Sequence, residues 1–376
     1  MVKLDPTYDV VVVGGGPAGL AAAIVAAERG VRVLVVEQRS FPADKACGEG
    51  LLPPAVRVLE RLGVLAEIAP AERRAFTAIR FVQEDGTRAT LPLPGNGGIG
   101  VRRTVLVAAM LRRAARLGVT LVDRTPVRSV ERSRQGAVVS TMHDAIRAEL
   151  VIAADGLHSP LRRAAGLQAP PSGQGRFALR QHFAIQPWSS CVEVYVDDLG
   201  EAVVTPVSEN AINVNFVWEP DSVDHPTLAK LSQRFPALRA RLESAESIST
   251  IRGAGPMARR ATRRSADRMI LIGDAAGFID SIAADGLSMA FSSALVLGEA
   301  LPAVLAAGAT AASLAPYERA ARGLFRNYQV VTSGLLWIAR HARLRRHLIH
   351  FLARHQAVGD VMMSGAMRLM LAAVPG

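Results

Sequence analysis

Three glycines near the N-terminus have the spacing of a site that binds phosphate groups. Gly14, Gly16 and Gly19 follow the apolar run Val10 to Val13 and open a helical pattern. In this register Gly14 permits a tight turn, Gly16 lets backbone N–H groups approach a pyrophosphate, and Gly19 lets the helix pack closely on the strand. The free N–H groups and the dipole at the helix N-terminus then favour the anion.

The residues that follow complete a dinucleotide-binding unit. Pro17 and Ala18 stand at the first helical positions, where the missing N–H of proline costs nothing. Glu37 ends the next buried strand, 23 residues after Gly14, and is placed to accept hydrogen bonds from an adenosine ribose. We expect Gln38 and Arg39, which follow it, to lie at the same end of the cofactor.

The elements that must position these residues form an α/β core. The first thirty or so residues of this core predict a strand, a helix and a second strand, and two later stretches, AELVIAADG and DRMILIGDAAG, repeat the pattern of a buried strand that ends in a glycine turn. A helix is expected at about 54–62 and another at about 104–117. A hairpin is expected from strands at 76–82 and 88–93.

The segment between the later two buried strands has a different character. Residues 166–252 alternate apolar and polar side chains in short segments, which indicates a mainly antiparallel sheet with one helix at about 226–242. This segment is expected to be inserted into the first domain. The tail from about residue 316 is expected to be helical, basic and amphipathic.

Two stretches carry a resemblance to a known family. They are ADGLHSPLRRAAG from Ala154 and ILIGDAAGFIDSIAADGLSMA from Ile270. Together with the N-terminal glycines they resemble the three sequence marks of the flavoprotein aromatic hydroxylase superfamily. That group contains p-hydroxybenzoate hydroxylase-like (group A) monooxygenases, flavin-dependent halogenases and geranylgeranyl reductases. The resemblance covers nearly the whole chain and implies FAD as cofactor, with NAD(P)H as a transient reductant because the chain has no second glycine fingerprint.

The resemblance also implies a fold. It is a Rossmann-like FAD-binding domain of the GR2 type with an inserted antiparallel β-sheet substrate domain and a helical C-terminal tail. The expected boundaries are 1–75, 97–165 and 252–315 for the discontinuous FAD-binding domain, 76–96 and 166–251 for the substrate domain, and 316–376 for the tail.

Several further cofactor residues are implied by the same marks. Asp155 and Gly156 match the pair near the join of the two cofactor-binding elements, and Ser159 and Arg162 belong to the same mark. Asp274, after Gly273, matches the aspartate that binds the ribityl hydroxyls. A helix that begins near Gly286 and Leu287 would point its positive end at the flavin pyrimidine edge. Arg103 matches a helix-start residue that contacts FAD in relatives, although its neighbour Arg102 remains an alternative.

The loop FPADKACGEGL, residues 41–51, is expected to run along the cofactor. Gly48 and Gly50 allow the backbone to approach the cofactor closely. Lys45 is expected to face the pyrophosphate or the substrate, and Cys47 is expected to lie near the flavin. Ala46, between them, is expected to contact the cofactor as well. A metal site at Cys47 is not expected because no partner ligands stand nearby, and no pattern pairs it with Cys191 in a disulfide. The role of Cys47, catalytic or structural, stays open.

The same loop looks most like the geranylgeranyl reductase-related branch and its oxygenase relatives. Reductases of that branch usually carry Y-x-W-x-F-P in the substrate sheet, whereas this chain has EAVVTP, with Glu201, Val203 and Thr205 in the aromatic positions. This departure favours an FAD-dependent, NAD(P)H-driven monooxygenase that uses molecular oxygen and hydroxylates a small aromatic or polyketide-like metabolite through a C4a-hydroperoxyflavin. Two alternatives are a flavin-dependent alkene or prenyl reductase and a flavoprotein that matures a partner protein.

Candidates for catalysis and substrate binding lie in the predicted substrate sheet. Arg180 and His182 alternate on one strand, so both side chains should face the same side. If that side faces the flavin, they could bind and deprotonate a phenolic or carboxylated substrate; otherwise they are polar residues of a sheet surface. Tyr195, Val203 and Thr205 are candidate substrate contacts. The Met-rich segment VMMSGAMRLM could line an apolar pocket or touch a membrane, but a packed helix is favoured.

Composition limits the class of protein. Half of the 376 residues are apolar and a fifth are charged, which is typical of a folded globular chain. The net charge of +11 comes almost entirely from arginines spread over helical segments, with few aromatic residues, so no nucleic-acid interface is expected. Peripheral contact with a membrane surface stays open. No stretch reaches about 18 uninterrupted apolar residues, so no transmembrane segment is expected, and we predict a cytoplasmic location.

Overall fold

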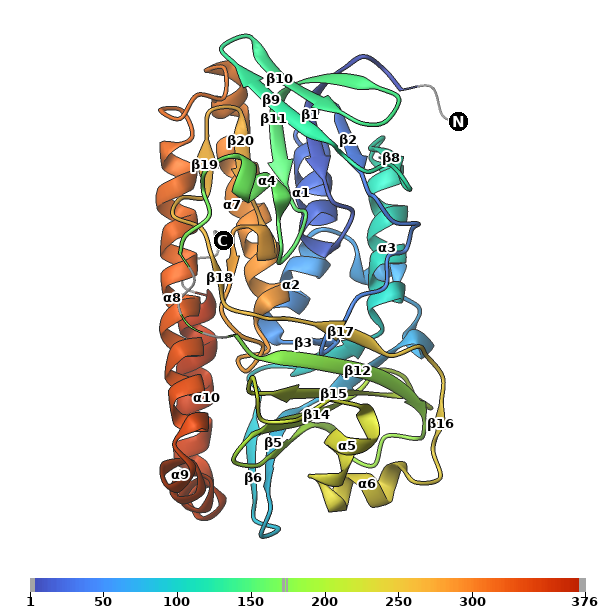
Figure 1. The fold of residues 1–376 in the computed structure, drawn as a ribbon, viewed down its shortest axis with the longest axis vertical. Coiled ribbons are helices and arrows are strands. Elements are labelled where there is room, and N and C mark those ends of the chain that lie inside the picture. Colours follow the sequence, from blue (N-terminus) through green and yellow to red (C-terminus); the bar gives the residue numbers. More distant parts are fainter. Residues whose placement is uncertain (1–3, 171–172, 174, 372–376) are drawn as a thin grey trace.

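The computed structural model describes residues 4–170, 173 and 175–371 and shows two β-sheets stacked along the long axis of the molecule (Figure 1). The first sheet has the order β19-β20-β11-β1-β2-β8, and the β9–β10 hairpin pairs with β11. β1 pairs in parallel with β2 on one side and with β11 on the other. The strand order therefore reverses at β1, and in such sheets ligands bind beyond the carboxyl ends of the strands at that point. The strands are β1 (Thr7–Val13), β2 (Val33–Val36), β8 (Thr120–Val122), β9 (Ser129–Ser133), β10 (Gly136–Ser140), β11 (Ala145–Ala153), β19 (Ser265–Ala266) and β20 (Met269–Leu271).

The first sheet is buried on both faces. Val10 and Val12 of β1 pack in one cluster with helices, and Val11 and Val13 pack in a second cluster on the opposite face. This explains the uninterrupted valine run, since neither face meets water. The helices of this part of the protein are α1 (Pro17–Ala27), α2 (Pro53–Arg61), α3 (Arg103–Arg116), α4 (Pro160–Ala164) and α7 (Gly286–Ala306).

α7 is the one described helix that is long and apolar enough to cross a bilayer. However, 67% of its most apolar window is buried inside the protein, against α1, α2 and α8 among other elements. A helix that is apolar all round is typical of a protein core as well as of a membrane span.

The second sheet has the order β16-β12-β15-β14-β13-β5-β6, with β17 also paired to β12. Its ladders are antiparallel except for β13 with β5. The expected single helix over 226–242 is two short helices, α5 (Leu228–Gln233) and α6 (Pro236–Leu242), because Pro236 cannot continue α5 and instead begins the next helix. The strands are β5 (Ala78–Gln83), β6 (Arg88–Pro92), β12 (Phe177–Ala184), β13 (Cys191–Val196), β14 (Gly200–Pro206), β15 (Ile212–Trp218), β16 (Glu246–Ser247) and β17 (Arg252–Ala254).

The two faces of the second sheet have different neighbours. α5 and α6 pack on one face through a cluster that includes Tyr195 and Phe216, and α9 and α10 pack near β5 and β6 on the other. The C-terminal helices are α8 (Ala315–Arg340), α9 (Ala342–Arg354) and α10 (Gln356–Leu371), and they form the left side of Figure 1. Two small sheets complete the fold, from β3 (Gly50–Leu51), β4 (Arg73–Phe76) and β7 (Gly98–Val101), and from β18 (Arg259–Arg260) and β21 (Gly277–Phe278).

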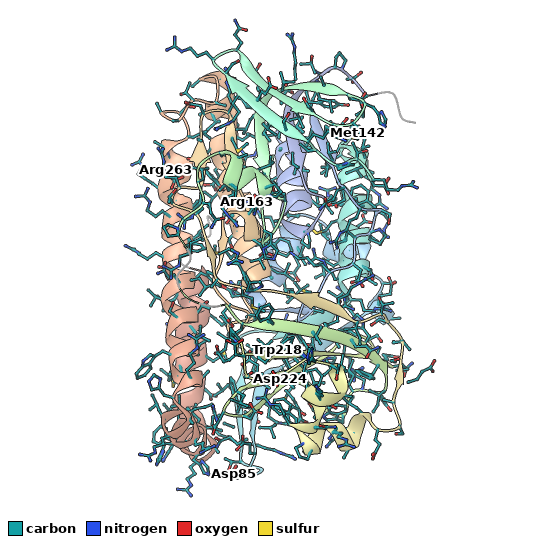
Figure 2. The ribbon with its side chains drawn as sticks, in the orientation of Figure 1. Asp85, Met142, Arg163, Trp218, Asp224 and Arg263 are labelled. Atoms are coloured by element: carbon teal, nitrogen blue, oxygen red, sulfur yellow. The ribbon has the colours of Figure 1, made fainter. Side chains whose placement is uncertain are left out.

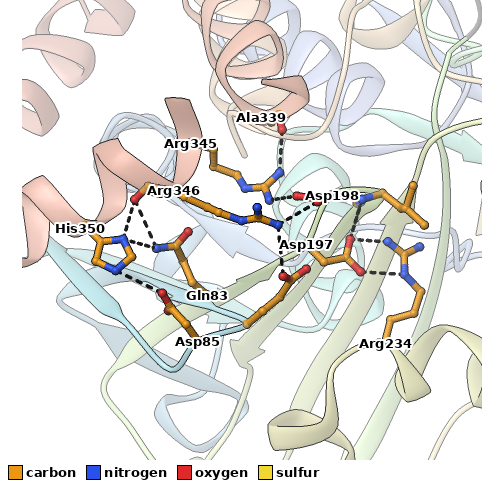
Figure 3. Close-up of polar contacts among 12 residues, drawn as sticks. Gln83, Asp85, Asp197, Asp198, Arg234, Ala339, Arg345, Arg346 and His350 are labelled. Carbon is orange, nitrogen blue, oxygen red and sulfur yellow. Dashed lines mark hydrogen bonds and ion pairs between the residues drawn. The ribbon is translucent and has the colours of Figure 1, made fainter. Parts of the chain in front are cut away.

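Polar contacts fasten α9 to turns of the second sheet (Figure 3). Arg345 and Arg346 both bind Asp198 in the β13–β14 turn, and His350 pairs with Asp85 in the β5–β6 turn. The C-terminal helices are thereby held over one face of the sheet. The predicted fold class, an α/β FAD-binding type of domain with a mainly antiparallel second sheet and a helical tail, is confirmed.

Candidate cofactor and substrate site

A large cavity, of about 750 Å³, runs from the carboxyl ends of β1, β2 and β11 to the C-terminal helices. Its walls come from both sheets, from the loop over residues 41–50, and from α8, α9 and α10. One part is lined by glycines and charged side chains, and the other by aliphatic side chains.

The glycine turn after β1 leaves backbone open to the cavity. Gly14 has a φ of +112°, and a Cβ at this position would overlap the Ala154 carbonyl. A Cβ on Gly16 would meet only an Arg103 guanidinium nitrogen, at 3.3 Å, so Gly16 faces space. Gly19 does not line the cavity; its Cβ would overlap the Gly14 carbonyl, as expected for close packing of helix on strand. The N-terminus of α1 therefore has room for an anion.

Glu37 is buried directly after β2. Its carboxylate accepts hydrogen bonds from the backbone N–H groups of Gly15, at 2.8 Å, and Arg39, at 2.9 Å. These contacts fix the carboxylate beside the glycine turn. The wall here also includes Thr125, Arg128 and other residues between β8 and β9, which sequence reasoning missed because the stretch TPVRS has no glycine or acidic signal.

Lys45 and Asp274 meet across the charged part of the cavity. Their side chains form an ion pair at 3.4 Å, and both are about a third exposed. Lys45 also lies beside Gly156, where a Cβ would be 3.3 Å from its Nζ. The expected pyrophosphate-side lysine and ribityl-side aspartate are thus within reach of one ligand.

Asp155 and Arg162 organise the turn after β11. One carboxylate oxygen of Asp155 accepts from the Leu161 backbone N–H, while its Oδ1 is buried without a partner among the described residues. Burial raises the pKa of Asp155 above its ordinary value. Such an unpartnered oxygen in a cavity wall suits a hydroxyl donor from a ligand.

Arg162 is fully buried and ties this turn to the one that carries Asp274. Its guanidinium donates to the carbonyls of Leu157, at 2.8 Å, and Ala275, at 2.9 Å, and to the side chain of Gln168. Arg162 thus positions two cofactor-facing turns without lining the cavity itself.

Arg180 and His182 share one face of β12, as the alternation predicts, but they contact the loop over residues 41–50 instead of lining the cavity. Arg180 donates to Asp44, at 2.5 Å, and His182 Nε2 lies 2.5 Å from Glu49 Oε2. Both side chains are buried, and the second oxygen of Glu49 accepts from the Arg103 backbone N–H. This geometry favours a role in holding the loop over contact with a substrate.

The second part of the cavity is an apolar lane across the second sheet. Because strands lie about 4.8 Å apart, the four spacings from β15 to β6 span roughly 19 Å. Val203 and Thr205 line the lane at β14, whereas Tyr195 points to the opposite face, where its hydroxyl donates to Glu193. The aliphatic walls come from Ile79, Phe81, Leu91, Val192, Val194, Val196, Val331, Leu335, Ile338, Leu348, Ile349, Leu352, Met362, Met363 and Met367.

Comparison with known proteins gives the family. A profile of the FAD binding domain matches residues 7–329. The chain belongs to this FAD-binding family. The predictions of FAD as cofactor and of an FAD-dependent oxidoreductase are therefore confirmed, and NAD(P)H use is typical of the family.

Individual relatives and solved structures have modest sequence identity to this chain. Digeranylgeranylglycerophospholipid reductase 1 of Methanothermobacter thermautotrophicus is 29% identical over 345 residues, covering 86% of this chain and 84% of the relative. Menaquinone reductase of Mycolicibacterium smegmatis is 36% identical over 170 residues, covering 43% of this chain and 41% of the relative. The structure of p-nitrophenol 4-monooxygenase from Pseudomonas putida superposes with a TM-score of 0.80 at 22% identity, covering 97% of this chain and 99% of that one, which shows a shared fold.

The cavity of this oxidoreductase fits FAD. The open glycine backbone and Lys45 can contact the phosphates of FAD. Asp274 and the Asp155 oxygen without a described partner can accept hydrogen bonds from its hydroxyl groups. Arg103 lines the cavity beside Gly16 and Arg102 does not. Gly19, Ser159 and Arg162 do not line the cavity, and the other residues expected at the cofactor do: Gly14, Gly16, Pro17, Ala18, Glu37, Gln38, Arg39, Lys45, Ala46, Cys47, Gly48, Arg103, Asp155, Gly156, Gly273, Asp274, Gly286 and Leu287.

Replacing Arg162 with methionine is expected to destabilise the oxidoreductase by about 3–5 kcal/mol, because several buried carbonyls lose their donor. Arg163→Met is the matched control. The Arg163 guanidinium is exposed, and among the described residues it donates to the His158 carbonyl alone, so a change within about 0.5 kcal/mol is expected. Thermal and urea unfolding measure both. Equal effects of the two variants would contradict the assigned role.

Asp285, at the start of α7, should make stability depend on pH. It is buried, its Oδ1 has no partner among the described residues, and burial raises its pKa to about 7. The folded state therefore binds its proton more tightly than the unfolded chain, and this contribution to stability is lost as the pH rises from about 4 through about 7. Asp285→Asn should raise the unfolding midpoint at about pH 8 by more than at about pH 5. A difference that stays constant over this range would contradict the assignment.

Proposed function

We propose that this FAD-dependent oxidoreductase saturates a carbon–carbon double bond in a long, isoprenoid-like chain. The observation that carries the proposal is the apolar lane of roughly 19 Å, whose walls suit an extended hydrocarbon better than a compact polar ring. The relatives named as reductases of digeranylgeranylglycerophospholipid and of menaquinone support it. Val203 and Thr205 stand where such reductases usually carry aromatics, a departure that counts against the proposal, and they place small side chains in the lane at β14.

Hydroxylation of a small aromatic or polyketide-like metabolite is the second candidate. It is favoured by Asn215 Oδ1 and Ser281 Oγ in the cavity wall, which have no partner in the described part of the chain and could bind a substrate hydroxyl. It is weakened because Arg180 and His182, the residues expected to bind and deprotonate a phenol, contact Asp44 and Glu49 instead.

In this reduction the protein itself would contribute a proton-bearing thiol and an apolar wall. Bound FAD would supply two-electron chemistry, with NAD(P)H as the source of the hydride equivalent. Saturation of one double bond consumes that hydride equivalent and one proton. Cys47 lies in the cavity wall, and burial raises the pKa of its thiol, so Sγ holds a proton at neutral pH. The aliphatic walls exclude water and orient the chain.

The deciding experiment is turnover of flavin-loaded enzyme with NAD(P)H and menaquinone or a geranylgeranyl lipid, without oxygen. A product with two added hydrogen atoms per reaction supports the proposal. A product that gains an oxygen atom from labelled oxygen, with no turnover under anaerobic conditions, would replace it with the second candidate.

Cys47→Ser is expected to retain FAD and to lower turnover by about 100-fold, because a positioned proton donor typically contributes this much. Cys191→Ser is the control, since Cys191 is buried outside the cavity wall and its loss should leave turnover nearly unchanged. Flavin content and steady-state rates measure both variants. Normal turnover in Cys47→Ser would show that Cys47 is structural.

A further inference from the structure

The solvent side of the C-terminal helices carries an unusual number of large apolar side chains. Val361 is 74% exposed, Val330 is 66% exposed and Trp337 is 56% exposed. Isolated exposed apolar residues are ordinary, but a group on neighbouring helices marks an interaction surface. We call this group the C-terminal apolar face, and it consists of Val330, Trp337, Leu344, Phe351, Val361 and Leu369.

These residues recur with helical spacing. Val330 and Trp337 on α8 are seven residues apart, as are Leu344 and Phe351 on α9, so each pair forms a stripe along one side of its helix. The helices pack on one another. α8 and α10 form a pair in Figure 1, and α9 lies at their lower end.

The apolar lane lies on the other side of α8: Leu335 lines the cavity, and it is two residues from Trp337, so the two side chains point in nearly opposite directions. Asn327 on α8 donates to the Leu369 carbonyl on α10, at 3.2 Å. The two helices run antiparallel there, so Leu335, eight residues further along α8, lies level with Met362, seven residues back along α10. Both side chains line the cavity and are also exposed, by 38% and 47%. Leu335 and Met362 thus belong to the inner wall that α8 and α10 contribute to the lane.

The same helices are strongly basic. Residues 315–371 contain nine arginines against two acidic residues, Glu318 and Asp360. Five of these arginines are exposed and have no carboxylate partner among the described residues, namely Arg319, Arg326, Arg343, Arg354 and Arg368. The nine are Arg319, Arg322, Arg326, Arg340, Arg343, Arg345, Arg346, Arg354 and Arg368.

Charge selects between the surfaces that could cover this face. A second copy of the chain docked through the same face would bring two sets of arginines together, which is unfavourable. An anionic bilayer offers a hydrocarbon region to the apolar side chains and negatively charged headgroups to the arginines. Amphipathic helices with arginines beside Trp, Phe and Leu lie in bilayer interfaces in this way.

We propose that the C-terminal apolar face docks on an anionic lipid bilayer. This docking does not depend on which reaction the enzyme performs.

The test is flotation of full-length, FAD-loaded protein with vesicles of phosphatidylcholine mixed with phosphatidylglycerol, or of phosphatidylcholine alone. We expect binding to the anionic vesicles that is at least about fivefold stronger than to the neutral ones and that weakens as salt is raised. Trp337→Glu should weaken partitioning about tenfold, and Arg343→Glu with Arg354→Glu should remove most of the preference for anionic lipid. None of these residues lines the cavity.

Met142→Glu is the matched control. Met142 is 52% exposed in the β10–β11 turn, at the end of the molecule away from α9, and its replacement should not change partitioning (Figure 2). Retained flavin shows that each variant is folded. Wild-type protein that does not float with anionic vesicles, or a Trp337→Glu variant that floats as well as wild type, would overturn the proposal. So would light scattering that shows a dimer dispersed by Trp337→Glu, because a second copy would then cover the face.

Discussion

Gly16→Val is expected to give a folded protein that no longer retains FAD. The backbone φ of Gly16 is −78°, which valine can adopt, and an added Cβ would meet only the Arg103 guanidinium at 3.3 Å. The branched side chain would instead occupy the space at the N-terminus of α1 that a pyrophosphate needs. We expect at least about 100-fold weaker FAD binding, a loss of about 3 kcal/mol. Flavin absorbance after gel filtration and fluorescence titration of FAD into the apoprotein measure it.

Two further glycine variants separate this effect from misfolding. Gly323→Ala on α8 places a methyl group where no atom lies within 4 Å and should retain FAD fully. Gly19→Val should fail to fold, since its Cβ would overlap the Gly14 carbonyl. Stoichiometric FAD in purified Gly16→Val would show that the cofactor does not use this turn.

Val203→Trp is expected to abolish turnover of long-chain substrates while FAD stays bound. Val203 lines the lane at β14, and its strand neighbours Val194 and Asn215 line the same cavity. An indole there would fill the lane between the cofactor part and the helices. We expect a fall in kcat/KM of at least about 100-fold, because an apolar chain can no longer be buried beyond β14. NAD(P)H-coupled rates with substrates of increasing chain length measure it.

Tyr195→Phe is the control for Val203→Trp, because it lies on the opposite face of the same sheet. Its loss costs one hydrogen bond to Glu193, about 1 kcal/mol of stability, and should leave KM unchanged. If Tyr195→Phe raised KM while Val203→Trp did not, the substrate would bind on the face of the sheet opposite the lane.

The cofactor half of the site could be predicted because its signals are local. A buried strand followed by a glycine turn fixes where each loop lies relative to the sheet, and Gly14, Asp155 and Asp274 all follow such strands. The prediction of a single helix over 226–242 was wrong, because Pro236 divides this segment into α5 and α6.

The substrate half could not be predicted in the same way. Alternation correctly placed Arg180 and His182 on one face of β12, but which partner covers that face depends on Asp44 and Glu49, more than 130 residues upstream. The lane likewise pairs strands near residue 80 with helices near residue 350, a juxtaposition that no short pattern encodes. The Met-rich segment is the packed helix that the sequence favoured, with Met363 and Met367 in a buried cluster, and Met362, Met363 and Met367 also line the cavity.

The cavity has solvent-exposed residues at both ends, Arg128 and Ser129 near Glu37 and Leu335 and Met362 on the helices. The glycine-lined part and the apolar lane are thus two ends of one cavity. A flavin held in the first part would leave the second part free. Product could then be exchanged for substrate while the cofactor stays in place.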